Sequence, residues 1–96
     1  MMEGAARMRI KEGYVMKKLG MGYVVVAIGD AGREFNGIIR LNDVGAFLWE
    51  SILNGTDSRQ KLVDAMLERY EGLDETAAAA DLDEFLDAVA FALEDH

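Results

Sequence analysis

The chain has 96 residues, of which 51% are apolar and 29% are charged, a composition that predicts one folded domain. Ten basic and eighteen acidic residues leave a net charge of −8, which disfavours affinity for nucleic acid and for anionic membranes. There is no cysteine and the one histidine is His96, so disulfides, Cys/His zinc sites and a Ser-His-Asp triad are excluded, and a small acidic binding module remains.

The first 41 residues carry the signals of β-structure. Residues 14–19 and 23–28 are rich in β-branched and aromatic side chains and are predicted strands, separated by a glycine-containing turn of hairpin length. Turn residues at 29–32 and at Phe35-Asn36-Gly37 precede a third short strand at 38–41. The pattern predicts a three-stranded antiparallel meander after a flexible start at residues 1–9.

The remaining residues predict three helices. The first follows Asn42 or Asp43 as its N-cap and ends at Asn54, which a glycine follows. The second begins at Asp57, with Gln60 three residues later as in a capping box, and stops before the next glycine.

The third helix is predicted to begin near Asp74, and its apolar stripe continues as far as Leu93. Its core-facing positions share a sector of about 100°, the width of an ordinary core stripe. They are Ala78, Leu82, Phe85, Leu86, Val89 and Leu93. Further apolar residues lie outside this sector. The helix is therefore either packed deeply between other elements or beside an apolar groove that is open to a ligand or partner.

The two halves of the chain carry opposite charge. Residues 1–41 hold seven bases and four acids, a net charge of +3, whereas residues 42–96 hold three bases and fourteen acids, a net charge of −11. One interpretation is that acidic helices keep a small protein soluble. The other is that one face meets a partner of opposite charge.

Three strands followed by three helices in fewer than 100 residues predict an α+β fold similar to a winged helix-turn-helix. Such folds often bind DNA through their last helix. Here that helix has no Lys or Arg and would repel phosphates, because its charged residues are all acids. They are Glu75, Asp81, Asp83, Glu84, Asp87, Glu94 and Asp95.

Several segments, in order, resemble the pyrroloquinoline quinone (PQQ) biosynthesis protein D family. They are FNGIIRLNDVGAFLWE at 35–50, NGT at 54–56, Tyr70 and ADLDEFL at 80–86. The resemblance extends from about Ile10 to Leu93. Its strongest part is the LN pair at 41–42 leading into AFLW at 46–49, followed at a spacing similar to the family's by Asp81 and Phe85-Leu86.

This resemblance implies a function. Members of the family are similar in being recognition elements for ribosomally made, post-translationally modified peptides, without catalytic residues, metal or cofactor. Their third strand accepts the leader of a precursor peptide, which lies between that strand and the third helix. A modifying enzyme, often a radical S-adenosylmethionine (SAM) protein, then receives the peptide.

Carried over to this chain, the resemblance implies a peptide-binding site made of one strand and one helix face. The strand edge maps to Ile38, Ile39, Arg40 and Leu41, and alternation does not tell which of the two isoleucines faces the core. Arg40 is a candidate partner for a leader carboxylate, and Asp81 or Glu84 for a leader base. The groove wall maps to Asp81, Leu82, Phe85, Leu86 and Val89.

The whole sequence predicts one domain at residues 10–95. No apolar run reaches the roughly 20 residues that span a bilayer, and the start does not resemble a signal peptide, which makes the cytoplasm the expected location. The alternatives are a winged-helix DNA-binding regulator and a docking or regulatory subunit of a larger enzyme. An exposed strand edge can also pair with its own copy, which leaves a homodimer as a further option.

Overall fold

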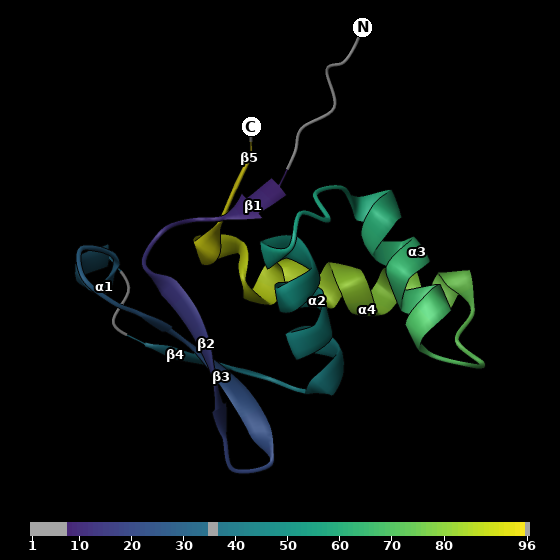
Figure 1. The fold of residues 1–96 in the computed structure, drawn as a ribbon, viewed down its shortest axis with the longest axis horizontal. Coiled ribbons are helices and arrows are strands. Elements are labelled where there is room, and N and C mark those ends of the chain that lie inside the picture. The colour runs from purple at the N-terminus through teal and green to yellow at the C-terminus, as the bar shows by residue number, and fades with distance from the viewer. Residues whose placement is uncertain (1–7, 35–36, 96) are drawn as a thin grey trace, which may run out of the picture.

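A computed structural model describes residues 8–34 and 37–95 and confirms the α+β architecture (Figure 1). A three-stranded antiparallel sheet consists of β2 (Tyr14–Leu19), β3 (Gly22–Ala27) and β4 (Ile38–Leu41), with β3 in the centre. The main helices are α2 (Asp43–Leu53), α3 (Arg59–Arg69) and α4 (Glu75–Ala88). None of the helices in this part of the chain is long and apolar enough to cross a membrane.

The loop between β3 and β4 contains one element that the sequence pattern did not predict. A single helical turn, α1 (Ala31–Glu34), occupies part of the segment predicted as a turn. Gly29 precedes it with φ +61°, a left-handed conformation that glycine adopts without steric cost. The predicted turn residues Phe35 and Asn36 lie outside the described residues.

The pairing register separates the two faces of the sheet, because directly paired residues of antiparallel strands lie on the same face. Met16 pairs with Val25, which pairs with Ile39, and fully buried Val25 marks this row as the core face. The neighbouring row includes Val26 and Ile38, and Ile38 is 62% exposed. Ile39 therefore faces the core, and Ile38 lies on the opposite face.

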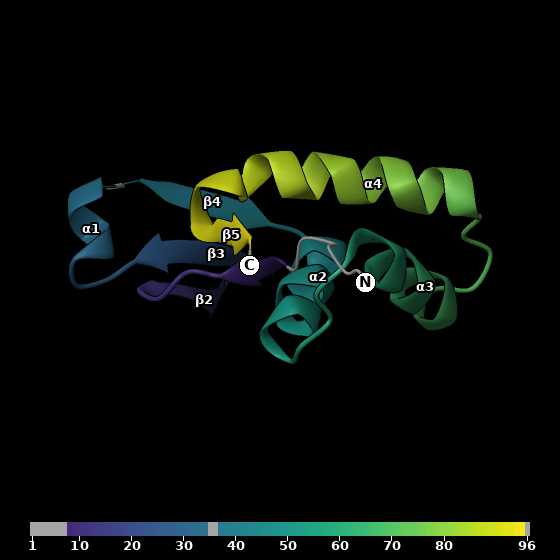
Figure 2. The ribbon, with the colours of Figure 1, turned by 90° about the horizontal axis from the view of Figure 1, so that it is seen from above.

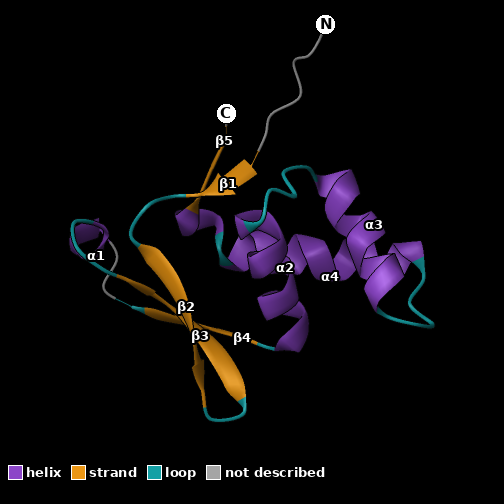
Figure 3. Cartoon of the chain, in the orientation of Figure 1, coloured by secondary structure: helices purple, strands orange, loops and turns teal. Residues whose placement is uncertain are grey.

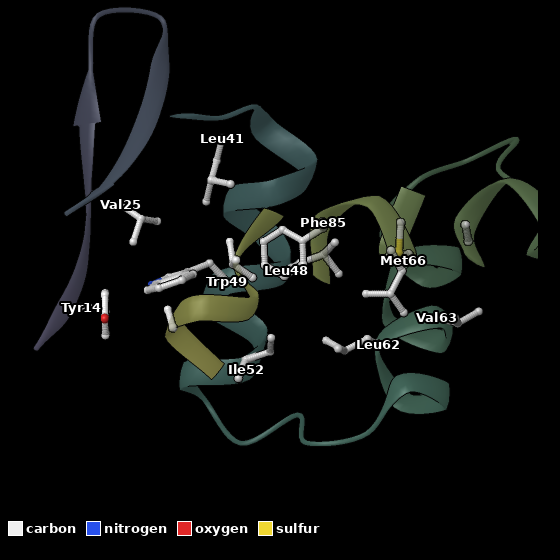
Figure 4. Close-up of a cluster of buried hydrophobic side chains, with 14 residues drawn as sticks. Tyr14, Val25, Leu41, Leu48, Trp49, Ile52, Leu62, Val63, Met66 and Phe85 are labelled. Carbon is white, nitrogen blue, oxygen red and sulfur yellow. The ribbon is translucent and has the colours of Figure 1, made fainter. Parts of the chain in front are cut away.

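The core lies between this sheet and the helices. Trp49 and Leu48 of α2 are fully buried, and the Trp49 ring extends toward Tyr14 and Val25 of the sheet (Figure 4). On its other side the cluster continues to Met66 of α3, which is also fully buried. Burial of large apolar side chains from strands and helices together is what fixes the sheet against the bundle.

Side-chain caps begin the three main helices. The Asn42 Oδ1 atom accepts a hydrogen bond of 2.8 Å from the Gly45 N–H, which confirms the predicted cap of α2. The predicted capping box at Asp57 is wrong. Ser58 is the cap of α3, because its extended backbone lets the hydroxyl accept from the Lys61 N–H at 3.2 Å.

The third helix is shorter than its apolar stripe predicts, since it ends at Ala88. The chain then forms a 3-10 turn, η1 (Ala90–Ala92), and a short strand, β5 (Leu93–Asp95), as Figure 3 shows. Leu93 is therefore a strand residue paired with Ile10, not a residue of the helix stripe. Apolar spacing alone could not tell whether Leu93 continues the helix or forms a strand, because the strand that pairs with it comes from the other end of the chain.

That strand, β1 (Met8–Ile10), pairs antiparallel with β5. The predicted flexible segment at 1–9 is thus too long, and residues 1–7 lie outside the described part of the chain. The Arg9 Nε atom donates to a Glu94 carboxylate oxygen at 2.6 Å, and the Lys11 N–H donates to the Ala92 carbonyl at 2.8 Å. These contacts hold the first described strand against the last.

Replacing Asn42 with Ala is expected to lower the free energy of unfolding by about 1 kcal/mol, because the Gly45 N–H loses its acceptor at the start of α2. Urea titration followed by fluorescence of the buried Trp49 measures this loss. Asn42→Asp keeps a capping oxygen and is expected to retain most of the stability. Equal losses in both variants would contradict a capping role.

Candidate functional site

The strand β4 lies at an open edge of the sheet. β4 pairs with β3 on one side and has no strand partner on the other side within residues 8–34 and 37–95. An edge strand presents backbone N–H and C=O groups that another extended chain can pair with. The four residues of β4 therefore offer a short template for an added strand.

A hollow of about 180 Å³ lies beside the end of this strand. Figure 2 shows α4 running past the end of β4 and the start of α2, the three elements that supply its walls. We call this hollow the groove. Its lining residues are Arg40, Leu41, Asn42, Val44, Gly45, Asp81, Glu84, Phe85 and Ala88.

A glycine at the start of α2, Gly45, allows one wall of the groove to lie close to the end of β4. A Cβ atom on Gly45 would lie 3.2 Å from the Cβ and Cδ2 atoms of Leu41, a tighter approach than most side chains make. The same glycine donates its N–H to Asn42. Glycine at this position therefore allows the cap, the strand end and the groove wall to lie together.

The rim of the groove carries charges of both signs. Arg40 comes from β4, whereas Asp81 and Glu84 come from α4, where a spacing of three residues places them on one side of the helix. All three residues are exposed, and within the described residues none of them takes part in an ion pair. They remain free to meet charges on a ligand.

Asp83, on the same helix, has a different role. The Arg59 guanidinium of α3 donates to both of its carboxylate oxygens, with Nε–Oδ1 and Nη2–Oδ2 distances of 3.0 and 2.9 Å. This hydrogen bonding lowers the pKa of Asp83, and the same pair raises the pKa of Arg59. Asp83 thus joins α4 to α3, while Asp81 and Glu84 are directed to the groove.

Five of the sequence-predicted residues come together at the groove, namely Arg40, Leu41, Asp81, Glu84 and Phe85. Phe85 is only 6% exposed, so it also belongs to the hydrophobic core. The structure thereby joins strand and helix residues that are about 40 positions apart in the sequence.

The other predicted residues lie outside the groove lining. Leu82 and Val89 are fully buried in the core and Leu86 is half-buried against it, because the helical period directs them toward the sheet and the bundle. Ile38 lies on the exposed face of the sheet, and Ile39 packs against the core.

Four lining residues were not among the predicted site residues. Asn42, Val44 and Gly45 form the start of α2, and Ala88 is the last residue of α4. The N-cap signal at Asn42 directly after a strand could have located the first three, because a cap fixes where a helix turns away from the strand. Ala88 carried no such signal.

Comparison with known proteins adds two findings. Residues 22–90 match the family model described as coenzyme PQQ synthesis protein D (PqqD). A solved structure described as TbiB1 in complex with the TbiA(beta) leader peptide has a similar fold, with a TM-score of 0.66, 23% sequence identity, and coverage of 85% of this chain and 87% of that chain. No curated protein matches this chain.

Proposed function

Because this chain belongs to the PqqD family, we propose that it binds the leader segment of a ribosomally made precursor peptide. In this proposal the protein is not an enzyme. It holds the peptide and presents it to a separate modifying enzyme, such as a radical SAM protein. The observation that carries the proposal is the open edge of β4 lying directly beside a groove lined by α4.

Capture takes place by strand addition. An extended leader pairs its backbone with the open edge of β4, so that the main chain supplies affinity that is largely independent of sequence. Every second side chain of an added strand points to the same face. Alternate leader residues therefore meet the groove, and these side chains supply selectivity.

The groove lining defines which leader residues fit. Leu41, Val44 and Phe85 offer apolar contact to an aliphatic or aromatic side chain. Asp81 and Glu84 attract a leader base, and Arg40 attracts a leader carboxylate. A leader segment with an apolar residue flanked by charged residues matches this arrangement.

The structural neighbour supports the proposal at the level of the fold. TbiB1 is described in complex with a leader peptide, and most of this chain superposes on that protein. The fold is therefore compatible with holding such a peptide.

A backbone-methylation scan of a synthetic leader tests strand addition. The peptide is a synthetic leader segment with an apolar residue flanked by charged residues, and each variant carries one N-methyl group. We expect affinity to fall at every second residue of the paired segment, because a lost backbone hydrogen bond costs about 0.5–1.5 kcal/mol and the methyl group adds steric cost. Isothermal titration calorimetry measures each dissociation constant.

The intervening residues are the internal control, since their N–H groups point away from β4 and methylation there is expected to have little effect. Sensitivity at every third or fourth residue would instead indicate a bound helix and would contradict strand addition. Tight, salt-sensitive binding to duplex DNA, without binding to the leader, would favour the winged-helix regulator.

A further inference from the structure

The sheet has a second surface, of which only Arg40 also lines the groove. Strand alternation and the pairing register place one set of side chains on the side of the sheet opposite the core, and we call this set the outer face. Figure 1 shows α2, α3 and α4 together on the other side of the sheet. The outer face consists of Val15, Lys17, Leu19, Val24, Val26, Ile38 and Arg40.

The outer face carries exposed apolar side chains. Leu19 and Ile38 are 56% and 62% exposed, and they belong to the five large hydrophobic residues that are exposed in the described part of the chain. Met21 is fully exposed at the tip of the β2–β3 hairpin, and Ile28, directly after β3, is 51% exposed. Apolar side chains that stay exposed on one face of a sheet are candidates for contact with a partner.

The charges of this sheet are of one sign. β2, β3 and β4 contain Lys17, Lys18 and Arg40, and no Asp or Glu. Lys17 and Arg40 pair with Val24 from the two sides, and Val24 is 6% exposed although it lies on the outer face. Lys17 and Arg40 are both exposed, so their charged ends are available to a partner.

We propose that the outer face is the docking surface for the peptide-modifying enzyme, which meets it with an apolar patch bordered by carboxylates. This inference rests on the proposed function, because it assumes that a modifying enzyme exists. The choice of partner rests on charge complementarity, since apolar side chains beside Lys17, which does not line the groove, match an acidic, apolar protein surface.

Other occupants fit less well. A second copy that docked by the same face would bring Lys17 and Arg40 near their own counterparts, without a carboxylate on these strands to neutralise them. An anionic membrane would be repelled by the net charge of −8 on the chain. Apart from Arg40, the outer face and the groove share no residue, so in this proposal leader and enzyme bind at the same time, as presentation of a peptide requires.

Charge reversal on adjacent lysines tests the surface. The purified enzyme that modifies the peptide bound by this chain is titrated with the wild-type chain, with Lys17→Glu and with Lys18→Glu, in the absence of leader. Both lysines are exposed on β2, but only Lys17 lies on the outer face. We expect Lys17→Glu to weaken enzyme binding about tenfold, as for an interfacial charge turned against its partner, and Lys18→Glu to change it less than twofold.

A second pair of variants tests the apolar part. Leu19→Asp on the outer face and Leu53→Asp on α2 change residues of nearly equal exposure, 56% and 59%. Only Leu19→Asp is expected to reduce enzyme binding, and calorimetry with the leader alone is expected to give wild-type affinity for both variants. Circular dichroism checks that both remain folded.

The remaining outcomes separate the two proposals. Leader binding without any enzyme binding by the wild-type chain would overturn the docking surface and leave peptide capture standing. Equal losses for Lys17→Glu and Lys18→Glu, or concentration-dependent dimers that Leu19→Asp dissolves, would also overturn it. Failure of the wild-type chain to bind the leader would contradict the proposed function itself.

Discussion

Replacing Ala88 with Trp is expected to reduce affinity for the leader peptide at least tenfold, which corresponds to about 1.4 kcal/mol. Ala88 is exposed at the end of α4 and lines the groove, whose volume is about 180 Å³. An indole at this position would fill the space that a leader side chain needs. Isothermal titration calorimetry with the synthetic leader measures the loss.

Ala80→Trp is the matched control, because Ala80 is exposed on the same helix but does not line the groove. Both variants are expected to unfold at nearly the wild-type urea concentration, since neither alanine is in the core. This pair is a sharper test than Phe85→Ala, which would also remove a core side chain that is only 6% exposed. Wild-type affinity of Ala88→Trp would remove the groove from the proposal.

The largest expected change in stability comes from Trp49→Ala, at about 3–5 kcal/mol. The side chain is fully buried between the sheet and the helices, and both layers pack against it. Its loss therefore leaves a cavity between them. A small domain has a total stability of about 5–15 kcal/mol, and the variant is therefore expected to be partly unfolded under mild conditions. Far-UV circular dichroism follows its urea transition, because the chain has no other tryptophan.

Trp49→Phe provides the comparison. The Trp49 Nε1 atom is buried and has no hydrogen-bond partner among the described residues, so phenylalanine keeps much of the apolar contact and removes an unsatisfied donor. We expect this variant to lose less than half as much free energy of unfolding as Trp49→Ala. A loss below about 1 kcal/mol for Trp49→Ala would show that the core can close over the vacancy.

Local sequence signals were sufficient for much of the fold. Alternation and β-branched residues located β2 and β4 at their observed bounds, and the capping residues Asn42 and Asp74 located the starts of α2 and α4. These features succeed because each depends on neighbours within one turn or one strand.

The remaining features depend on contacts between distant segments. The pairing of Ile10 with Leu93 ends the helix pattern early, and no local signal near Leu93 reveals that partner. The groove was predicted from the apolar side of α4, yet Leu82 and Val89 face the core. Which side of a helix borders a groove depends on how the helix packs, and this packing is a property of the whole chain.

The β1–β5 pairing has a mechanical consequence. Met8 lies opposite Asp95, so the two described ends of the chain leave the domain at the same end of a two-stranded ribbon. Tension applied between these ends would load the backbone hydrogen bonds one after another, because they run across the strands, and would peel the ribbon open from its tip. The ribbon, which supplies no residue to the groove lining, is therefore the part of the described chain expected to yield first under load.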